Sequence, residues 1–294
     1  MTGFSADWLA LREPFDQAAR AAAAPALNWP ALAAHLQAAG TPTTVLDLGC
    51  GTGATLRAMA PRLGPVQHWR LVDHDARLLA AVPDALGPWG QANGLRLCAQ
   101  GDLLVLEGAG RRIEVERCQA DLVAGFAGLP FAGAQLVTAS ALLDLVSAPW
   151  LAALVTRCRA EAAAVYWALT VDDRVEWQTA DAGDTLVHAA FRAHQRRDKG
   201  FGPALGGAAV AEAGALLTQA GYRVTQGPSD WCVDGAYGQP GPAMLRAMVQ
   251  GMGTAAAEQA PAEAAAVQAW QARRWAQCDA TRLRVGHADL LGCL

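Results

Sequence analysis

One short segment constrains the fold of this chain more than any other: an apolar run that ends in alternating glycines. The run is Val45–Leu48, and Gly49, Gly51 and Gly53 follow it. It predicts a buried strand, because short continuous apolar segments are typical of parallel sheets. Residues 54–60 have a helical composition, so the glycines lie where a strand end meets a helix N-terminus and the backbone approaches a ligand closely. The segment therefore predicts an α/β sheet with a nucleotide-type pocket.

The glycine spacing and a nearby acid narrow the class of ligand. The order is G-x-G-x-G, whereas dinucleotide-binding loops have G-x-G-x-x-G. Asp47 precedes the first glycine by two positions, and a carboxylate there repels a pyrophosphate and favours a cationic ligand. On these residues the segment resembles motif I of the class I S-adenosylmethionine (SAM) dependent methyltransferases, whose cofactor carries a sulfonium and an ammonium group and no phosphate. The glycines alone would also fit an ordinary strand–helix turn.

Two further acids follow predicted strands. Asp73 ends the strand 69–72, at the distance from the glycines where an acid holds a ribose diol, and we expect Asp75 to be the N-cap of the next helix. Asp121 precedes the strand 135–139, and the resemblance implies that such an acid meets the adenine amine while its backbone neighbour meets the ring. The resemblance, which covers residues 40 to 170, thus implies SAM as cofactor, bound by Asp47, Gly49, Cys50, Gly51, Gly53, Asp73, His74, Asp121, Leu122 and Thr138.

Composition limits the partners and the compartment. The chain has 294 residues, 53% hydrophobic and 17% charged, which fits one large α/β domain with insertions. Its net charge of −4 argues against a protein that wraps nucleic acid. The seven cysteines form no C-x-x-C pair and suit a reducing compartment. We therefore expect a cytoplasmic protein with no membrane or nucleic-acid partner and no metal; the oligomeric state stays open.

The order of predicted elements outlines the fold. We expect a doubly wound, mostly parallel seven-stranded sheet whose last strand, 283–291, is antiparallel. Residues 1–40 predict an N-terminal helical extension, which the resemblance implies is a lid over the cofactor. Residues 41–294 predict the SAM-dependent methyltransferase domain. It should carry a hairpin insertion near 94–118, substrate-side insertions near 172–205 and 238–280, and helix breaks near Gly251–Gly253 and Pro261.

Residues after the fourth and fifth strands are candidates for the substrate side. Asp144 follows the fourth strand, where the resemblance implies proximity to the transferred methyl, so it could accept a proton as a catalytic base. The alternative is that Asp144 caps or solvates a helix turn. Four aromatic side chains could stack on a planar substrate: Trp167, Trp177, Trp231 and Tyr237. With ten tryptophans in the chain, core packing is the alternative for any single one.

The segment 188–200 gathers cations. Lys199 is the only lysine of the chain, which suggests that a compact ammonium is needed there. In a helix, His188, Arg192, Arg196 and Lys199 would share one face, and we predict that this face binds an anionic group of the substrate, with Lys199 in a catalytic role. The alternative is that the cations complement a helix C-terminus closed by Gly200.

The resemblance implies an enzyme that transfers a methyl group to O, N or C of a small metabolite, which these candidates suggest is anionic or planar. A methyltransferase acting on RNA or protein is the alternative, disfavoured by the acidic balance. A further alternative is a protein that binds SAM without transferring its methyl group.

Overall fold

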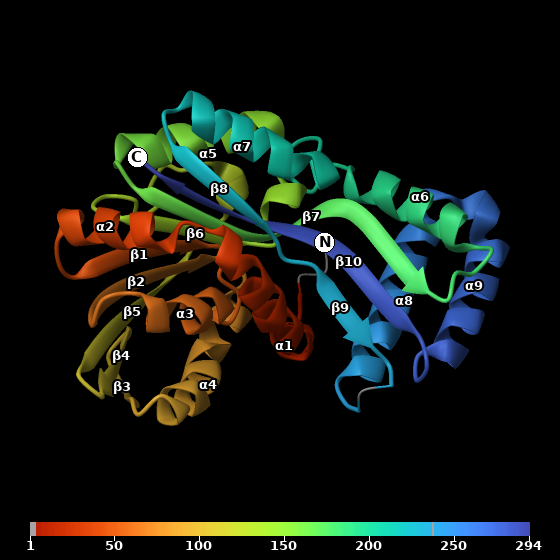
Figure 1. Cartoon of the computed structure of the whole chain (residues 1–294), viewed down its shortest axis with the longest axis horizontal. Coiled ribbons are helices and arrows are strands. Elements are labelled where there is room, and N and C mark those ends of the chain that lie inside the picture. Colours follow the sequence, from red (N-terminus) through yellow and green to blue (C-terminus); the bar gives the residue numbers. More distant parts are fainter. Residues whose placement is uncertain (1–3, 237) are drawn as a thin grey trace.

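A computed structural model of the chain describes residues 4–236 and 238–294, and its centre is one large twisted sheet (Figure 1). Five neighbouring strands of this sheet are parallel. In spatial order they are β5 (Arg111–Gln119), β2 (Val66–Asp73), β1 (Thr43–Leu48), β6 (Leu136–Ser140) and β7 (Ala164–Gln178). Their apolar side chains are buried on both faces, as expected of parallel strands between helical layers.

The far side of the sheet contains the antiparallel strand that the sequence predicts. β10 (Arg282–Cys293) lies between β7 and β8 (Arg223–Pro228) and runs antiparallel to both. Seven strands therefore have the order β5-β2-β1-β6-β7-β10-β8. This arrangement confirms the predicted fold class, a doubly wound, mostly parallel sheet with an antiparallel last strand.

Three shorter strands enlarge the sheet to ten within the described residues. β3 (Arg96–Gln100) and β4 (Leu103–Gly108) pair with each other and extend the sheet beyond β5, so the predicted hairpin is present as β4 and β5. β9 (Trp231–Asp234) pairs with the first part of β10.

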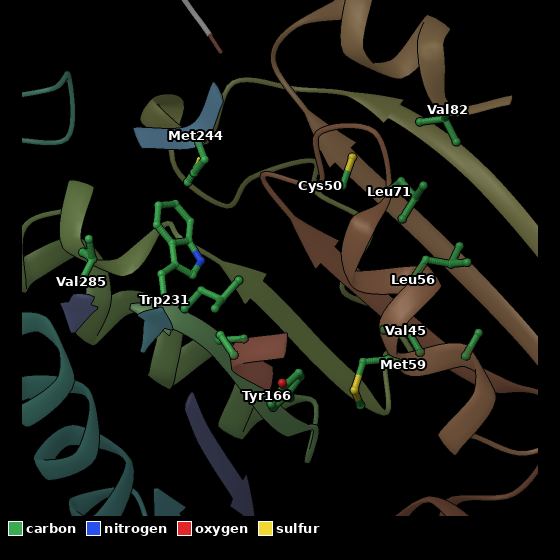
Figure 2. Close-up of a cluster of buried hydrophobic side chains, with 14 of the residues drawn as sticks. Val45, Cys50, Leu56, Met59, Leu71, Val82, Tyr166, Trp231, Met244 and Val285 are labelled. Carbon is green, nitrogen blue, oxygen red and sulfur yellow. The ribbon is translucent and has the colours of Figure 1, made fainter. Parts of the chain in front are cut away.

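Helices cover both faces of the sheet. α5 and α7 pack over one face, and α3 and α4 over the other (Figure 1). Figure 2 shows part of the second core, where Val45 of β1, Leu56 and Met59 of α3 and Tyr166 of β7 belong to one buried cluster. The helices are α1 (Ala6–Ala23), α2 (Trp29–Ala39), α3 (Ala54–Met59), α4 (Ala76–Ala92), α5 (Ala148–Ala160), α6 (Asp184–Gln195), α7 (Ala209–Gln219), α8 (Gly241–Gln259) and α9 (Ala264–Gln277).

Two predictions about the C-terminal half are wrong in detail. Gly251–Gly253 does not interrupt a helix, because α8 continues through it, and a Cβ on Gly253 would clash with the side chain of Gln271 in α9. That glycine permits close helix packing, whereas the other predicted break, at Pro261, is confirmed. Residues 172–178, expected to open an insertion, continue β7, because β10 pairs with them as far as Arg282.

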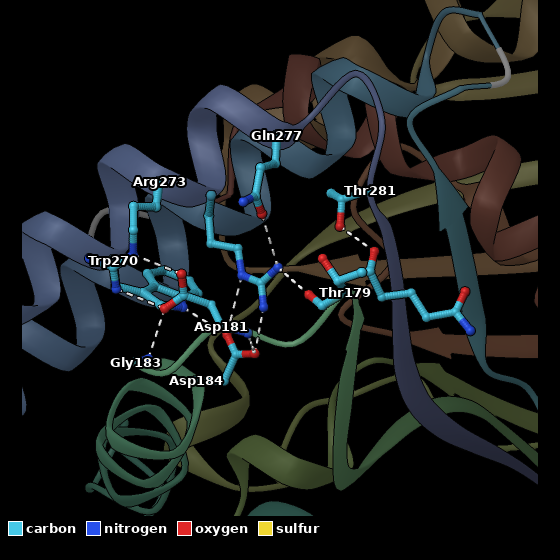
Figure 3. A network of polar contacts seen from close by, with 10 residues as sticks. Thr179, Asp181, Gly183, Asp184, Trp270, Arg273, Gln277 and Thr281 are labelled. Atoms are coloured by element: carbon cyan, nitrogen blue, oxygen red, sulfur yellow. Dashed lines mark hydrogen bonds and ion pairs between the residues drawn. The ribbon is translucent and has the colours of Figure 1, made fainter.

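A buried polar network fixes α6 against α9 (Figure 3). The side chain of Arg274 is fully buried, and its Nη1 donates to the carbonyl oxygen of Thr179 at 2.7 Å. Its Nε donates to Oδ1 of Asp184 at 3.2 Å, and the same oxygen accepts a hydrogen bond from Nε1 of Trp270 at 2.8 Å. Arg274 and Asp184 form a buried ion pair, and each of them therefore has a further hydrogen-bond partner besides the other.

Candidate functional site

A hydrogen bond from a backbone amide to a carboxylate side chain joins the glycine loop after β1 to the end of β2. Its three glycines have positive φ angles, +66° at Gly49, +55° at Gly51 and +82° at Gly53, which other residues rarely adopt. The amide of Gly51 donates to Oδ2 of Asp73 at 2.8 Å, and Oδ1 of Asp73 accepts from the amide of Asp75 at 3.0 Å. Asp73 is therefore a buried carboxylate held between the loop and the next helix.

Asp47 lies under this loop and is fully buried. Its Oδ1 accepts a hydrogen bond from Oγ1 of Thr138 at 2.7 Å, whereas its Oδ2 has no partner. Burial raises the pKa of Asp47 to about 7, although the Thr138 hydrogen bond and the charge of Arg20 act in the opposite direction. At this point β1 and β6 lead to helices on opposite faces of the sheet, which is the usual place for a ligand crevice.

The other candidate cofactor residues lie at the same edge of the sheet. Oδ1 of Asp121 accepts the amide of Val123 at 2.9 Å and so caps the short turn after β5. Leu122, in that turn, is buried. His74 is exposed, with Nδ1 3.4 Å from Oδ1 of Asp73. The thiol of Cys50 is buried, and burial raises its pKa well above its usual value. The structure thus brings together residues from the ends of β1, β2, β5 and β6. Asp75 is the N-cap of α4, as predicted.

The N-terminal helix α1 covers the glycine loop. A Cβ built on Gly51 would lie 2.9 Å from Cδ1 of Leu9. Further along α1, Arg20 reaches the end of β6 and donates from Nη2 to Oγ of Ser140 at 2.6 Å.

Three charged residues of α1 point into the molecule, and the sequence analysis missed them. Arg12, Asp16 and Arg20 are each at most 8% exposed. Asp16 accepts hydrogen bonds from Nε of Arg12 and from Nε1 of Trp231, both at 2.9 Å. Their i, i+4, i+8 spacing places them on one helical face, which is the signal that would have identified them.

Asp144 lies in a short 3₁₀ turn after β6 and is 6% exposed. Its Oδ1 has no hydrogen-bond partner. Burial raises the pKa of Asp144 to about 6; the nearby charge of Arg12 lowers it and that of Asp173 raises it. A carboxyl group with this pKa is present in both protonation states near neutral pH.

The three candidate tryptophans, Trp167, Trp177 and Trp231, are buried, and Tyr237 lies outside the described residues. Trp167 is 0% exposed, in the core below α5 and α7. Trp231 packs under α1, with the guanidinium carbon of Arg12 4.9 Å from its ring centroid.

The four predicted cations do not form one helical face. α6 ends at Gln195, so Arg196 is its C-cap and Lys199 lies beyond the helix. Gly200 N–H and Gly202 N–H both donate to Oδ1 of Asp198, which explains why the chain turns there. α6 packs on α8, on the side of the molecule away from α3 and α4 (Figure 1).

The same four residues have different environments. His188 is buried, and burial lowers its pKa. Nη2 of Arg196 lies 2.9 Å from Oδ2 of Asp173. The charge of Asp173 in turn acts on Asp144. Arg192 is partly buried on α6. Burial and the charge of Arg197 lower the pKa of Lys199.

Among residues 4–236 and 238–294, no group of His, Cys, Asp or Glu side chains is arranged to hold a metal ion. None of the helices described in these ranges combines the length and the apolar character that a membrane span requires.

No protein-family model and no curated protein matches this chain. Solved structures do resemble it at low identity. A cyclopropane-fatty-acyl-phospholipid synthase-like protein from Lactobacillus casei is 14% identical, with 99% of this chain and 93% of that chain covered and a TM-score of 0.49. SAM-dependent methyltransferases crystallised with S-adenosylhomocysteine come from Geobacter sulfurreducens (16% identity, 95% and 97% covered, TM-score 0.40) and Thiobacillus denitrificans (17% identity, 90% and 89% covered, TM-score 0.39). The strand order described above is that of a doubly wound, mostly parallel α/β sheet with an antiparallel last strand.

Proposed function

We propose that this chain is a SAM-dependent methyltransferase that methylates O, N or C of a small metabolite. The observation that carries the proposal is a pair of acids near the point where β1 and β6 lead to helices on opposite faces of the sheet. Asp73 binds the glycine loop, and the buried Asp47 keeps one oxygen without a partner. SAM supplies an electrophilic methyl carbon on a sulfonium, and the protein contributes mainly by positioning the acceptor.

The residues at this edge fit SAM. A buried carboxylate with a free oxygen favours a cationic group, so Asp47, oriented by Thr138, would face the ammonium of the methionine part. Asp73 would accept the ribose hydroxyls, and Asp121 the adenine amine. A pyrophosphate does not fit, because both Asp47 and Asp73 would repel it. The acid set therefore supports SAM over a dinucleotide.

Helix α1 would act as a lid in this proposal. Leu9 contacts the loop at the position where a ligand would approach Gly51. In this proposal the helix shifts to let the cofactor reach the loop.

Asp144 would serve as the base on the acceptor side. It is buried, its Oδ1 is free to accept a proton, and burial holds its pKa near the range where a base works at neutral pH. Binding of an anionic acceptor by Lys199, His188, Arg192 and Arg196 stays a prediction. A higher KM for the acceptor in Lys199→Met, with SAM affinity unchanged, is the result that would support it.

Calorimetry with S-adenosylhomocysteine tests the cofactor site. Asp73→Ala removes the carboxylate proposed for the ribose, and hydrogen bonds to charged groups contribute about 1.5–3 kcal/mol each. We expect at least about a hundredfold loss of affinity from two such bonds. Asp75→Ala, which removes an acid two residues away that caps α4, should leave the affinity within about threefold.

Unchanged affinity in a folded Asp73→Ala protein, or tight binding of NAD by the wild type, would refute the assignment. Activity is tested separately with methyl-labelled SAM and a metabolite extract. A new labelled product identified by mass spectrometry supports a methyltransferase, whereas binding without any product supports the alternative of a SAM-binding protein.

A further inference from the structure

A cavity of about 140 Å³ lies on the α3 face of the sheet. Its walls come from α1, from the start of α2, from the end of α3 and from Tyr166 of β7. Gln17 and Arg62 are exposed at its rim, whereas Arg20, Met59 and Tyr166 are buried. The cavity therefore has an open rim and a buried floor.

Two guanidinium groups give this cavity a positive charge. Arg20 is only 7% exposed, and its Nε has no hydrogen-bond partner although Nη2 donates to Ser140. Within the described part of the chain, neither Arg20 nor Arg62 forms an ion pair at salt-bridge distance. A buried donor without a partner is costly, so an acceptor placed in the cavity would satisfy Arg20.

The tyrosine of the cavity, Tyr166, does not neutralise this charge. Tyr166 donates its hydroxyl to Oδ2 of Asp289 at 2.6 Å, and burial raises the pKa of its phenol well above the usual value. The phenol is therefore neutral and engaged with Asp289. The charge available to a ligand comes from Arg20 and Arg62.

Apolar side chains also line the cavity. They include Trp29, whose ring centroid lies 4.8 Å from the guanidinium carbon of Arg62, and Met59 and Ala58 of α3. A cavity of about 150 Å³ with apolar walls holds a benzene ring. The space thus matches a ring of about six atoms, with a guanidinium group beside it.

We propose that this cavity is a binding site for a small carboxylic acid with a planar ring, whose carboxylate meets Arg20 and whose ring lies between Trp29 and Met59. None of the residues that line the cavity is among those that we propose for the cofactor, so a ligand there does not depend on the proposed methyl transfer.

Benzoate is the probe, with benzyl alcohol as the neutral molecule of the same shape, and binding is followed by ligand-detected NMR and calorimetry on the full chain. We expect saturable benzoate binding, with benzyl alcohol weaker by about tenfold or more because it lacks the charge that Arg20 binds. Arg20→Gln should weaken benzoate binding by about tenfold or more. Arg96→Gln, which removes an exposed positive charge from the distant strand β3, should not change it.

Three results would overturn the proposal: no saturable benzoate binding, equal binding by wild type and a folded Arg20→Gln protein, or displacement of benzoate by S-adenosylhomocysteine. The last would make the cavity part of the cofactor site. Ala58→Leu, which narrows the cavity without changing a charge, gives a second measure, and undiminished binding in this variant would also contradict the site. Failure of S-adenosylhomocysteine to bind at all would refute the proposed function alone.

Discussion

Glu13 of α1 and Arg57 of α3 form a two-point ion pair, with Nε to Oε1 at 2.7 Å and Nη2 to Oε2 at 2.6 Å. The same guanidinium donates from Nη1 to the carbonyl oxygen of Thr52 in the glycine loop at 2.6 Å. Both partners are largely shielded from solvent, with side-chain exposures of 5% for Arg57 and 19% for Glu13. The pair therefore fastens the N-terminal helix directly to the loop that we propose binds the cofactor.

Weakening this pair should open the lid. Glu13→Gln keeps the shape of the side chain but removes its charge, so α1 should leave the loop more often. We expect the association rate of S-adenosylhomocysteine to rise by about threefold to tenfold, because the closed form loses about 1 kcal/mol of stabilisation from the ion pair. Stopped-flow fluorescence measures this rate. Asp7→Asn, an exposed acid on the same helix, is the control and should not change it. An unchanged rate in Glu13→Gln would mean that α1 does not limit access.

A pair of glycines separates backbone strain from the contact with α1. Gly51 and Gly101 both have positive φ, +55° and +64°, but a Cβ on Gly51 meets Leu9 whereas one on Gly101 meets nothing within 4 Å. Each change to Ala should cost about 1 kcal/mol of stability through φ alone. Only Gly51→Ala should also weaken S-adenosylhomocysteine binding. Chemical denaturation and calorimetry check the two expectations, and equal cofactor affinity in both variants would assign the glycine loop a purely structural role.

The proposed base predicts a pH dependence. Burial raises the pKa of Asp144 to about 6, and only its ionised form accepts a proton, so kcat should rise as the pH increases through about 6. Asp144→Asn should lower kcat by about 10²-fold or more and remove this limb of the profile. Asp102→Asn, an exposed acid in the β3–β4 turn, should change neither. A pH profile that persists in Asp144→Asn would assign the ionisation to another group.

The network of Figure 3 predicts a large difference between two neighbouring arginines. Arg274 is fully buried against Asp184, whereas the side chain of Arg273 is 48% exposed in its ion pair with Asp181. Arg274→Met should lower the free energy of unfolding by about 3–5 kcal/mol, and Arg273→Met by about 1 kcal/mol or less. Urea denaturation measures both.

This difference should itself depend on pH. Although burial opposes it, the hydrogen bond from Arg274 lowers the pKa of Asp184. A lowered carboxyl pKa contributes stability above its unfolded value that is lost as the pH falls through the folded value. The deficit of Arg274→Met should therefore shrink below about pH 4. A deficit independent of pH would show that packing, and not charge, dominates at this position.

The fold could be predicted because its evidence is local. Val45–Leu48 and 162–170 are continuous apolar runs, and glycines mark the turn that follows the first of them. The end of β7 could not be predicted, because residues 172–178 are mostly charged or polar and pair with β10, more than a hundred positions later. The sequence predicts a helix break at Gly253. Only the structure shows that the absence of a side chain there leaves room for Gln271 of α9.

The part of the candidate site that could be predicted is the set of acids at the ends of predicted strands. Asp47 lies near the end of β1 and Asp73 ends β2, so their meeting at one edge of the sheet follows from parallel pairing. The contribution of α1 was not predictable in this way. Arg12, Asp16 and Arg20 have helical spacing that indicates a shared face, but the sequence does not say whether that face meets solvent or the sheet. The helical position predicted for Lys199 is wrong, because α6 ends at Gln195 and the chain turns at Asp198.

The place of β10 has a consequence for synthesis on the ribosome. β10 follows the other described strands in the sequence, yet it lies inside the sheet between β7 and β8. Until residues 282–293 are synthesised, one edge of β7 and one edge of β8 lack a partner strand, and unpaired edges recruit other strands. A chain truncated before Arg282 should therefore aggregate rather than fold.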